Sequence, residues 1–167
     1  NINLQIPAPV VKNEAFIIPS DVCFAGKAVD PRRLGLAVDG TWGVAAGALS
    51  FDYLWNEIRV KGGAYGCGFR CAADHQLAFY TYRDPAIDPS LERIGHAGAW
   101  LRSFDPAPEV FEGFIVSCVS SHDAPTKPYG LARRQDGEFF AKRPVDWRES
   151  RRNAMLSATP EKVRALA

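Results

Sequence analysis

The chain has 167 residues, of which 47% are apolar and 23% are charged, a balance typical of one globular domain of ordinary size. Its formal net charge of +1 excludes a global field that would attract nucleic acid or an anionic membrane. No apolar run reaches the length of about 18 residues that a membrane span needs. We therefore expect a folded domain with neither a nucleic-acid nor a membrane partner.

The cysteines lie at positions 23, 67, 71 and 118, without a C-x-x-C pair or zinc-finger spacing. Cys67 and Cys71 fall in one expected strand, so about 13 Å would separate them, which is too far for a disulfide. Reduced thiols in a reducing compartment are the expectation. A thiol-based sensor that uses these two cysteines is an alternative.

The first part of the chain predicts a lead-in and one strand. Residues 1–13 contain two prolines and are interpreted as a linker. Residues 14–27 alternate in polarity and predict a strand, in which one face carries Phe16, Ile18, Val22 and Phe24. Pro19 cannot donate to a neighbouring strand, so this strand should lie at an edge or bulge there. A turn around Asp30 and Pro31 follows.

A long helix is predicted next, from about residue 41 to residue 61. Asp39 or Thr41 could cap its start. Its apolar stripe recurs at helical spacing and comprises Val44, Gly47, Ala48, Phe51, Leu54, Trp55 and Ile58. Gly62 or Gly63 should end the helix by adopting the left-handed conformation.

Residues 64–72 and 76–83 predict a β-hairpin around residues 73–75, since both are rich in strand-forming residues. Alternation in the first strand places two sets of side chains on opposite faces. One set is Tyr65, Cys67, Phe69 and Cys71, and the other is Ala64, Gly66 and Gly68.

From residue 84 onward the apolar period becomes helical. Asp88 should cap a helix with Leu91, Ile94, Gly98 and Leu101 inward, and Asp105 should open another with Val110, Phe111, Phe114, Ile115 and Cys118 inward. Three more helices are expected at about 128–142, 144–157 and from 160, where Thr159 precedes a proline. The order of elements predicts an α+β fold, a mainly antiparallel sheet covered by helices on one face.

Most patterns for catalysis or metal binding are missing from the sequence. His75, His96 and His122 have no second histidine at ligand spacing and there is no H-x-x-E-H, so no metal should be bound by this chain. The serines beside His122 and Asp123 are sequence neighbours, which rarely form a triad. The glycine-rich stretch 62–68 lacks the lysine-serine or lysine-threonine of a phosphate loop.

Arg59 and Tyr65, on either side of Gly62 and Gly63, remain as candidate site residues. In a purely structural interpretation, Arg59 stabilises the helix end and Tyr65 packs on the sheet. In a functional one, the glycines let another backbone approach and the two side chains donate to carbonyl oxygens of an extended peptide.

The stretch YLWNEIRVKGGAYGCGFR, followed by LAFYTYRDP, resembles the last domain of the presequence protease branch of the pitrilysin/insulinase zinc metallopeptidases. A turn with prolines at 125 and 128 adds to the likeness, which covers about residues 14–167. The resemblance implies a chain of four similar α+β domains that close around an unstructured oligopeptide. Residues 1–13 would be the lead-in and residues 14–167 the C-terminal domain of that longer chain. The helical pattern at the chain end also favours a piece of a longer protein.

The same resemblance implies the division of labour in such an enzyme. Zn²⁺ would be held in the first domain by H-x-x-E-H and a distant glutamate. The last domain would supply Arg59 to hold the peptide and Tyr65 to stabilise the oxyanion, with Gly62 and Gly63 clearing space for the peptide. The isolated chain would then be inactive, and its partners would be the substrate peptide and the N-terminal domains of the same polypeptide. A cytoplasmic bacterial location is expected, with an organellar matrix as the alternative. A non-catalytic peptide-binding or scaffold subunit is the rival function.

Overall fold

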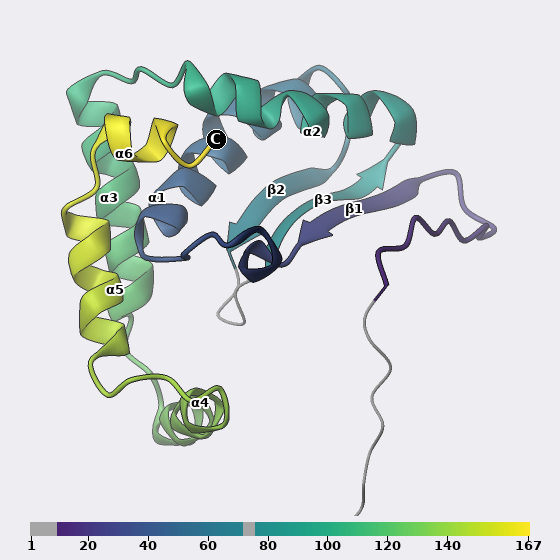
Figure 1. The fold of residues 1–167 in the computed structure, drawn as a ribbon. Coiled ribbons are helices and arrows are strands. Elements are labelled where there is room, and N and C mark those ends of the chain that lie inside the picture. Colours follow the sequence, from purple (N-terminus) through teal and green to yellow (C-terminus); the bar gives the residue numbers. More distant parts are fainter. Residues whose placement is uncertain (1–9, 72–75) are drawn as a thin grey trace, which may run out of the picture.

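The computed structural model describes residues 10–71 and 76–167 (Figure 1). Within these ranges, β1 (Cys23–Val29), β2 (Gly66–Cys71) and β3 (Leu77–Asp84) form one antiparallel sheet in the order β1-β3-β2. The central strand β3 pairs with both neighbours, so β1 and β2 are the two outer strands. The predicted α+β class is confirmed, and so is the hairpin of β2 and β3. Its predicted turn at 73–75 lies outside the described residues.

The predicted long helix is confirmed as two segments that follow each other without a break. They are α1 (Thr41–Ala48) and η2 (Leu49–Val60). In η2 the turns are wide, because the Lys61 N–H donates to the carbonyl oxygen of Asn56, five residues back, at 3.0 Å. At the start, the Asp39 Oδ1 accepts a hydrogen bond from the Thr41 N–H at 2.8 Å. The buried side chains of Val44, Leu54 and Ile58 belong to the core between this helix and the sheet.

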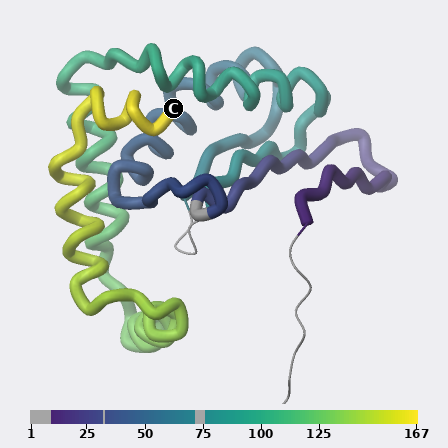
Figure 2. Tube along the Cα trace, viewed as in Figure 1, coloured from purple at the N-terminus to yellow at the C-terminus, as the bar shows by residue number. Residues whose placement is uncertain are grey.

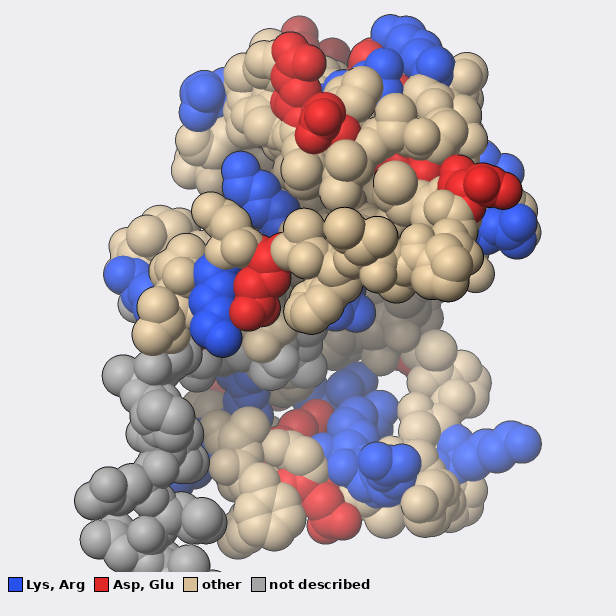
Figure 3. Space-filling model, turned by 90° about the vertical axis from the view of Figure 1, so that its right-hand side faces the viewer, with Lys and Arg blue, Asp and Glu red and all other residues tan. Residues whose placement is uncertain are grey.

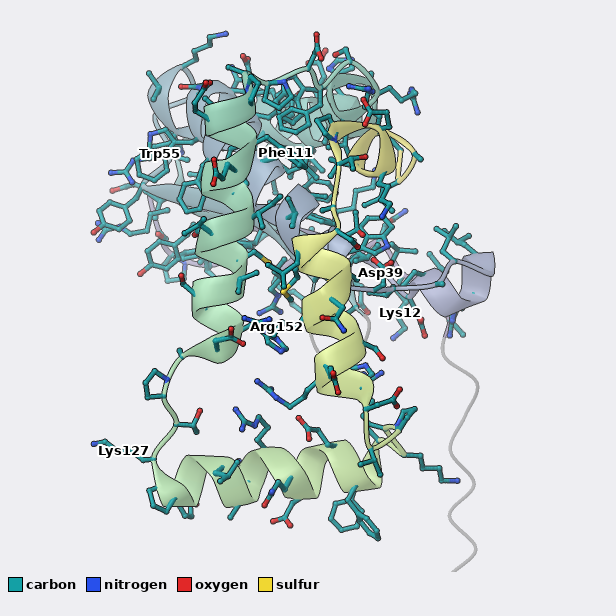
Figure 4. The ribbon with its side chains drawn as sticks, turned by 90° about the vertical axis from the view of Figure 1, so that its left-hand side faces the viewer. Lys12, Asp39, Trp55, Phe111, Lys127 and Arg152 are labelled. Atoms are coloured by element: carbon teal, nitrogen blue, oxygen red, sulfur yellow. The ribbon has the colours of Figure 1, made fainter. Side chains whose placement is uncertain are left out.

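The other helices surround this centre. They are η1 (Pro31–Leu34), α2 (Ile87–Arg102), α3 (Pro108–Asp123), α4 (Pro128–Phe140), α5 (Trp147–Leu156) and α6 (Pro160–Arg164). The helix α2 packs on β1 and β3, α3 and α5 pack beside α1, and α6 returns to α1 and α2 near the C-terminus (Figure 2). In Figure 4, α4 lies across the ends of α3 and α5. No helix within the described ranges is both long and apolar enough to cross a membrane.

Charge on the face shown in Figure 3 is mixed, with acidic and basic side chains interspersed over its upper part. Basic side chains gather in the lower part, at the end of the molecule where Figure 1 places α4. Arg134 on α4 and Arg148 on α5 share one carboxylate there, Glu138, at 4.0 and 3.8 Å. The α5 helix is also tied to α3, because Arg152 pairs with Asp123 at 2.7 Å.

The predicted first strand is only partly right. β1 covers residues 23–29, whereas residues 14–22 form no strand, and Phe16 and Ile18 are 83% and 51% exposed. The physical reason is strand pairing. Residues 23–29 pair with β3 from Leu77 to Asp84, so the alternating residues before position 23 have no strand to pair with in this sheet.

Several finer predictions also need correction. Asp88 lies inside the first turn of α2, which Ala86 precedes, and α3 begins at Pro108 rather than beside Asp105. Leu91 and Val110, expected inward, are 38% and 46% exposed. The Thr159 cap is confirmed, since its hydroxyl accepts from the Lys162 N–H at 3.3 Å.

Candidate functional site

The turn between η2 and β2 depends on both of its glycines. Gly63 has a φ of +80°, a conformation that other residues adopt only with strain. A Cβ at Gly62 would lie 2.5 Å from the carbonyl oxygen of Ile58. Backbone hydrogen bonds from Gly63 to Arg59 (2.9 Å) and from Ala64 to Ile58 (3.2 Å) close the helix end. The glycines therefore have a structural reason in the turn itself, besides the open space for a peptide that the resemblance implies.

Arg59 lies in the last turn of η2 and stacks on an aromatic ring of the same helix. Its guanidinium carbon is 3.9 Å from the ring centroid of Trp55, one turn earlier. The same carbon is 5.8 Å from the ring centroid of Tyr65. Arg59 is half-buried, and no ion pair links it to a carboxylate in the described ranges. The structure thus brings the two predicted site residues together across the glycine turn.

Tyr65 stands immediately before β2 and is 65% exposed. Its ring meets the ring of Tyr82 on β3 edge to face, with centroids 5.9 Å apart. The prediction that Tyr65 shares the face of Cys67 and Phe69 is wrong, because Tyr65 is exposed whereas Phe69 is buried. The prediction that Ala64 shares the face of Gly66 and Gly68 is also wrong, because Ala64 is buried in the core. The strand alternation begins only at Gly66, after the left-handed turn has redirected the chain.

Arg83 is a site residue that the sequence reasoning missed. Its carbonyl oxygen accepts a hydrogen bond from the Tyr65 N–H at 3.2 Å. Its guanidinium carbon lies 5.9 Å from the Tyr65 ring centroid, so Arg59 and Arg83 lie at nearly equal distances from this ring. The sequence held no clear signal for this role, since Arg83 is far from Tyr65 along the chain and is brought to it by strand pairing.

Comparisons with known proteins identify the family of this chain. A family described as the PreP C-terminal domain matches residues 13–165, which is nearly the whole chain. The chain belongs to this family. Among curated relatives, the mitochondrial presequence protease of Yarrowia lipolytica is 30% identical over 99% of this chain, and Protein HypA of Clostridium perfringens is 26% identical over 93%. Presequence protease 1, chloroplastic/mitochondrial, of Arabidopsis thaliana is 33% identical over 68% of the chain.

The chain spans only 16% of the length of the Yarrowia and Clostridium relatives and 11% of the Arabidopsis one. It corresponds to one domain of those proteins. The resemblance noted in the sequence is thereby confirmed at the level of the family.

In this PreP-type domain the site can offer hydrogen-bond donors but few groups for chemistry of its own. A phenol donates one hydrogen bond, and a guanidinium offers several donors and no acceptor. In the described ranges, no group of three or more His, Cys, Asp and Glu side chains could hold a metal ion. The described residues therefore do not gather into a zinc centre, whereas Arg59, Tyr65 and Arg83 offer hydrogen-bond donors that suit oxygen acceptors.

The thiols of Cys67, Cys71 and Cys118 pack against the hydrophobic core. Cys67 faces the core, and its Sγ donates to the carbonyl oxygen of Leu54 at 3.2 Å. Burial raises the pKa of the Cys67 thiol. A raised pKa disfavours the thiolate, which is the form that reacts with oxidants, so Cys67 makes a poor redox sensor.

Proposed function

We propose that this chain is the C-terminal, non-zinc-binding domain of a zinc-dependent oligopeptidase, where it binds the peptide and stabilises the oxyanion. The observation that carries this proposal is the exposed Tyr65 ring, which has the guanidinium carbons of Arg59 and Arg83 within 5.8 and 5.9 Å of its centroid. Neither Arg59 nor Tyr65 is sealed in the core, and both stand beside β2, an outer strand of the sheet. These donors therefore remain available to a bound peptide.

Each residue has a separate part in the proposed reaction. Arg59, held flat against Trp55, donates to a backbone carbonyl and keeps the extended peptide in place. The Tyr65 hydroxyl donates to the reacting carbonyl oxygen as negative charge develops on it. Removal of one such donor costs about 100- to 1000-fold in kcat in enzymes that use it. Because β2 is an outer strand, an extended peptide can also pair with it.

The zinc ion of the proposed enzyme would be bound by another domain. When bound, zinc polarises the scissile carbonyl and activates a water molecule. The described residues of this chain do not gather into a metal site, so the part proposed for this domain is to bind the peptide and to stabilise the oxyanion. An isolated chain with this composition would not hydrolyse peptides.

Domain arrangement, partners and location follow from the same proposal. Residues 14–167 would form one of four domains that enclose an unstructured oligopeptide, and the N-terminal domains of the polypeptide would be the partners of this one. The names of the Yarrowia and Arabidopsis relatives place those proteins in mitochondria or chloroplasts. These names favour the organellar alternative over the cytoplasmic bacterial location expected from the sequence.

The decisive test uses the full-length enzyme with Tyr65→Phe and Arg59→Ala. Tyr65→Phe should lower kcat about 100- to 1000-fold with unchanged zinc content. Arg59→Ala should raise KM and also lower kcat, since it removes binding made before and during the reaction. Tyr129→Phe and Arg133→Ala are matched controls, because both residues are exposed on α4, away from the site.

Wild-type turnover in the Tyr65→Phe enzyme would refute the oxyanion role. A full-length protein that binds peptides through Arg59 and cleaves none, with or without added zinc, would favour the rival function of a non-catalytic peptide-binding subunit. Chelator-sensitive peptidase activity in the isolated chain would contradict the proposed division between domains.

A further inference from the structure

Arg83 adopts a backbone conformation that is unusual for its residue type. In the described part of the chain, Arg83 (φ 49°) and Lys142 (φ 52°) are the non-glycine residues with positive φ. Lys142 directly follows the end of α4, and its N–H donates to the Phe139 carbonyl oxygen at 2.9 Å. A left-handed residue is common just after a helix, so the position of Lys142 is explained by helix termination.

Arg83 lies instead within β3, at a β-bulge. Cys23 pairs with Asp84 and Ala25 pairs with Thr81, so the single residue between them on β1 faces two residues on β3, Tyr82 and Arg83. Bulges of this kind usually place glycine at the left-handed position, because glycine has no Cβ to clash there. Bulges also occur often beside active sites, where they redirect a side chain. An arginine at this position therefore points to a function for its side chain.

The bulge brings Arg83 to the site in two ways. Its carbonyl oxygen holds the Tyr65 backbone at 3.2 Å, and its guanidinium lies 5.9 Å from the Tyr65 ring, nearly matching the 5.8 Å of Arg59. Arg83 is exposed, and no ion pair joins it to a carboxylate in the described ranges. Two arginines beside one phenol, with no carboxylate partner in the part of the chain that the structure describes, make a surface for the oxygen atoms of a ligand.

We propose that Arg83 is a third peptide-binding residue of this site. Its guanidinium donates to a carbonyl or carboxylate oxygen of the peptide, next to the oxygen that Tyr65 binds. The inference rests on the proposed peptidase function. It adds that the bulge of β3 exists to present this arginine, at the expense of an unfavourable backbone conformation.

The test compares Arg83→Gly with Lys142→Gly in the full-length enzyme. Each change replaces a basic residue of positive φ by glycine, which removes the backbone strain and one positive charge. Both variants should therefore keep a thermal midpoint within about 4 °C of wild type. Arg83→Gly should lower kcat/KM about tenfold, mainly through KM, as the loss of a hydrogen bond to a charged group does. Lys142→Gly should leave both kinetic constants unchanged. Arg83→Lys, which keeps the charge, should recover part of the loss, and Arg83→Asn, which suits the left-handed conformation, should not.

The source of the bound oxygen is distinguished by the choice of peptide. If Arg83 binds a carboxylate, the loss should shrink for peptides with an amidated C-terminus or with Gln in place of Glu. If it binds a backbone carbonyl, the loss should be the same for all of them. Unchanged kcat/KM in both Arg83→Gly and Arg83→Asn, on every peptide, would overturn the inference. If Tyr65→Phe and Arg59→Ala still impair the enzyme, the proposed function stands and only the role of Arg83 is refuted. If Tyr65→Phe and Arg59→Ala also leave the enzyme unchanged, the proposed function is refuted as well.

Discussion

The guanidinium of Arg59 rests on the ring of Trp55, with 3.9 Å between the guanidinium carbon and the ring centroid. The two residues are one helical turn apart on η2, and Trp55 is itself 37% exposed. A planar cation stacked on an aromatic face loses freedom of rotation and keeps its N–H groups directed along the ring plane. Trp55 therefore restrains the guanidinium of Arg59, and in the proposed function this contact would orient Arg59 toward the peptide.

We expect Trp55→Leu to lower kcat/KM of the full-length enzyme about twofold to fivefold, since a cation–π contact at a partly exposed site contributes about 0.5–1 kcal/mol. Trp55→Phe should cause a smaller loss of kcat/KM than Trp55→Leu, because phenylalanine keeps an aromatic ring for the guanidinium of Arg59. In an Arg59→Ala background, Trp55→Leu should cause no further loss. Phe51→Leu is the control, because Phe51 is a 63% exposed aromatic one turn earlier on η2. Additive losses in the double variant would show that Trp55 acts independently of Arg59.

Gly40 is the contact point between the start of α1 and α5. A Cβ placed there would overlap the carbonyl oxygen of Arg151 and lie 2.8 Å from the backbone nitrogen of Met155. Backbone atoms cannot move aside as a flexible side chain can, so Gly40→Ala should push α5 away from α1. We expect a loss of about 2 kcal/mol or more in the free energy of unfolding, as overpacking in a core produces.

Urea denaturation of the isolated chain measures this effect. Gly137→Ala is the control, because nothing lies within 4 Å of its Cβ position on α4. That change should stabilise the chain by about 0.4–1 kcal/mol through the lower entropy of the unfolded state. Equal stability of the two alanine variants would contradict the close packing of α5 on Gly40.

Much of this fold could be predicted from the sequence because its signals are local. The apolar residues at helical spacing, the glycines that end the helix and the two strands around residues 73–75 each depend on nearby residues. The predicted stripe is wrong at two positions, because Phe51 and Trp55 are 63% and 37% exposed. The first strand was misplaced because strand bounds depend on pairing: only residues 23–29 find a partner in β3. Alternation alone cannot show which half of an alternating stretch will pair.

The site follows the same division. Arg59 and Tyr65 could be identified because both lie in one short motif with a resemblance to a known family. Arg83 lies beside them because β2 pairs with β3 in a register that places Gly66 opposite Tyr82. A β-bulge in the pairing of β1 with β3 also shapes this position, and the bulge could not be predicted from the residue pattern. The exposure of Tyr65 was likewise set by the left-handed turn at Gly63, which shifts where the alternation begins.

The thiols should react slowly at neutral pH. Burial raises the pKa of Cys67 and of Cys118, and in each case a nearby arginine, Arg59 or Arg151, only partly opposes it. Because the thiolate is the reactive form, modification of both should accelerate only at a higher pH than modification of a free thiol does. Labelling with a disulfide reagent, followed by mass spectrometry at several pH values, measures the rates. The same chain in urea gives the unprotected reference, and equal rates for folded and unfolded Cys67 at pH 7 would revive the thiol-sensor alternative.

His122 should make the domain less stable in mild acid. Burial lowers the pKa of His122, and the positive charge of Arg148 lowers it further, while Asp123 acts in the opposite direction. With a folded pKa below the unfolded value of about 6.5, the unfolded chain binds more protons in this range. The contribution to stability is therefore present above the unfolded pKa and declines as pH falls through 6.5 toward the folded pKa.

Urea midpoints of the isolated chain at pH 7.5 and pH 5.5 test this dependence. The urea midpoint of the wild-type chain should be lower at pH 5.5 than at pH 7.5. His122→Asn should reduce this decrease, because it removes the group that takes up a proton on unfolding. His96→Asn, on the exposed face of α2, is the matched control and should leave the decrease in place. An undiminished decrease in the His122→Asn chain would show that other groups, and not the half-buried imidazole of His122 beside Arg148, govern the acid sensitivity of this domain.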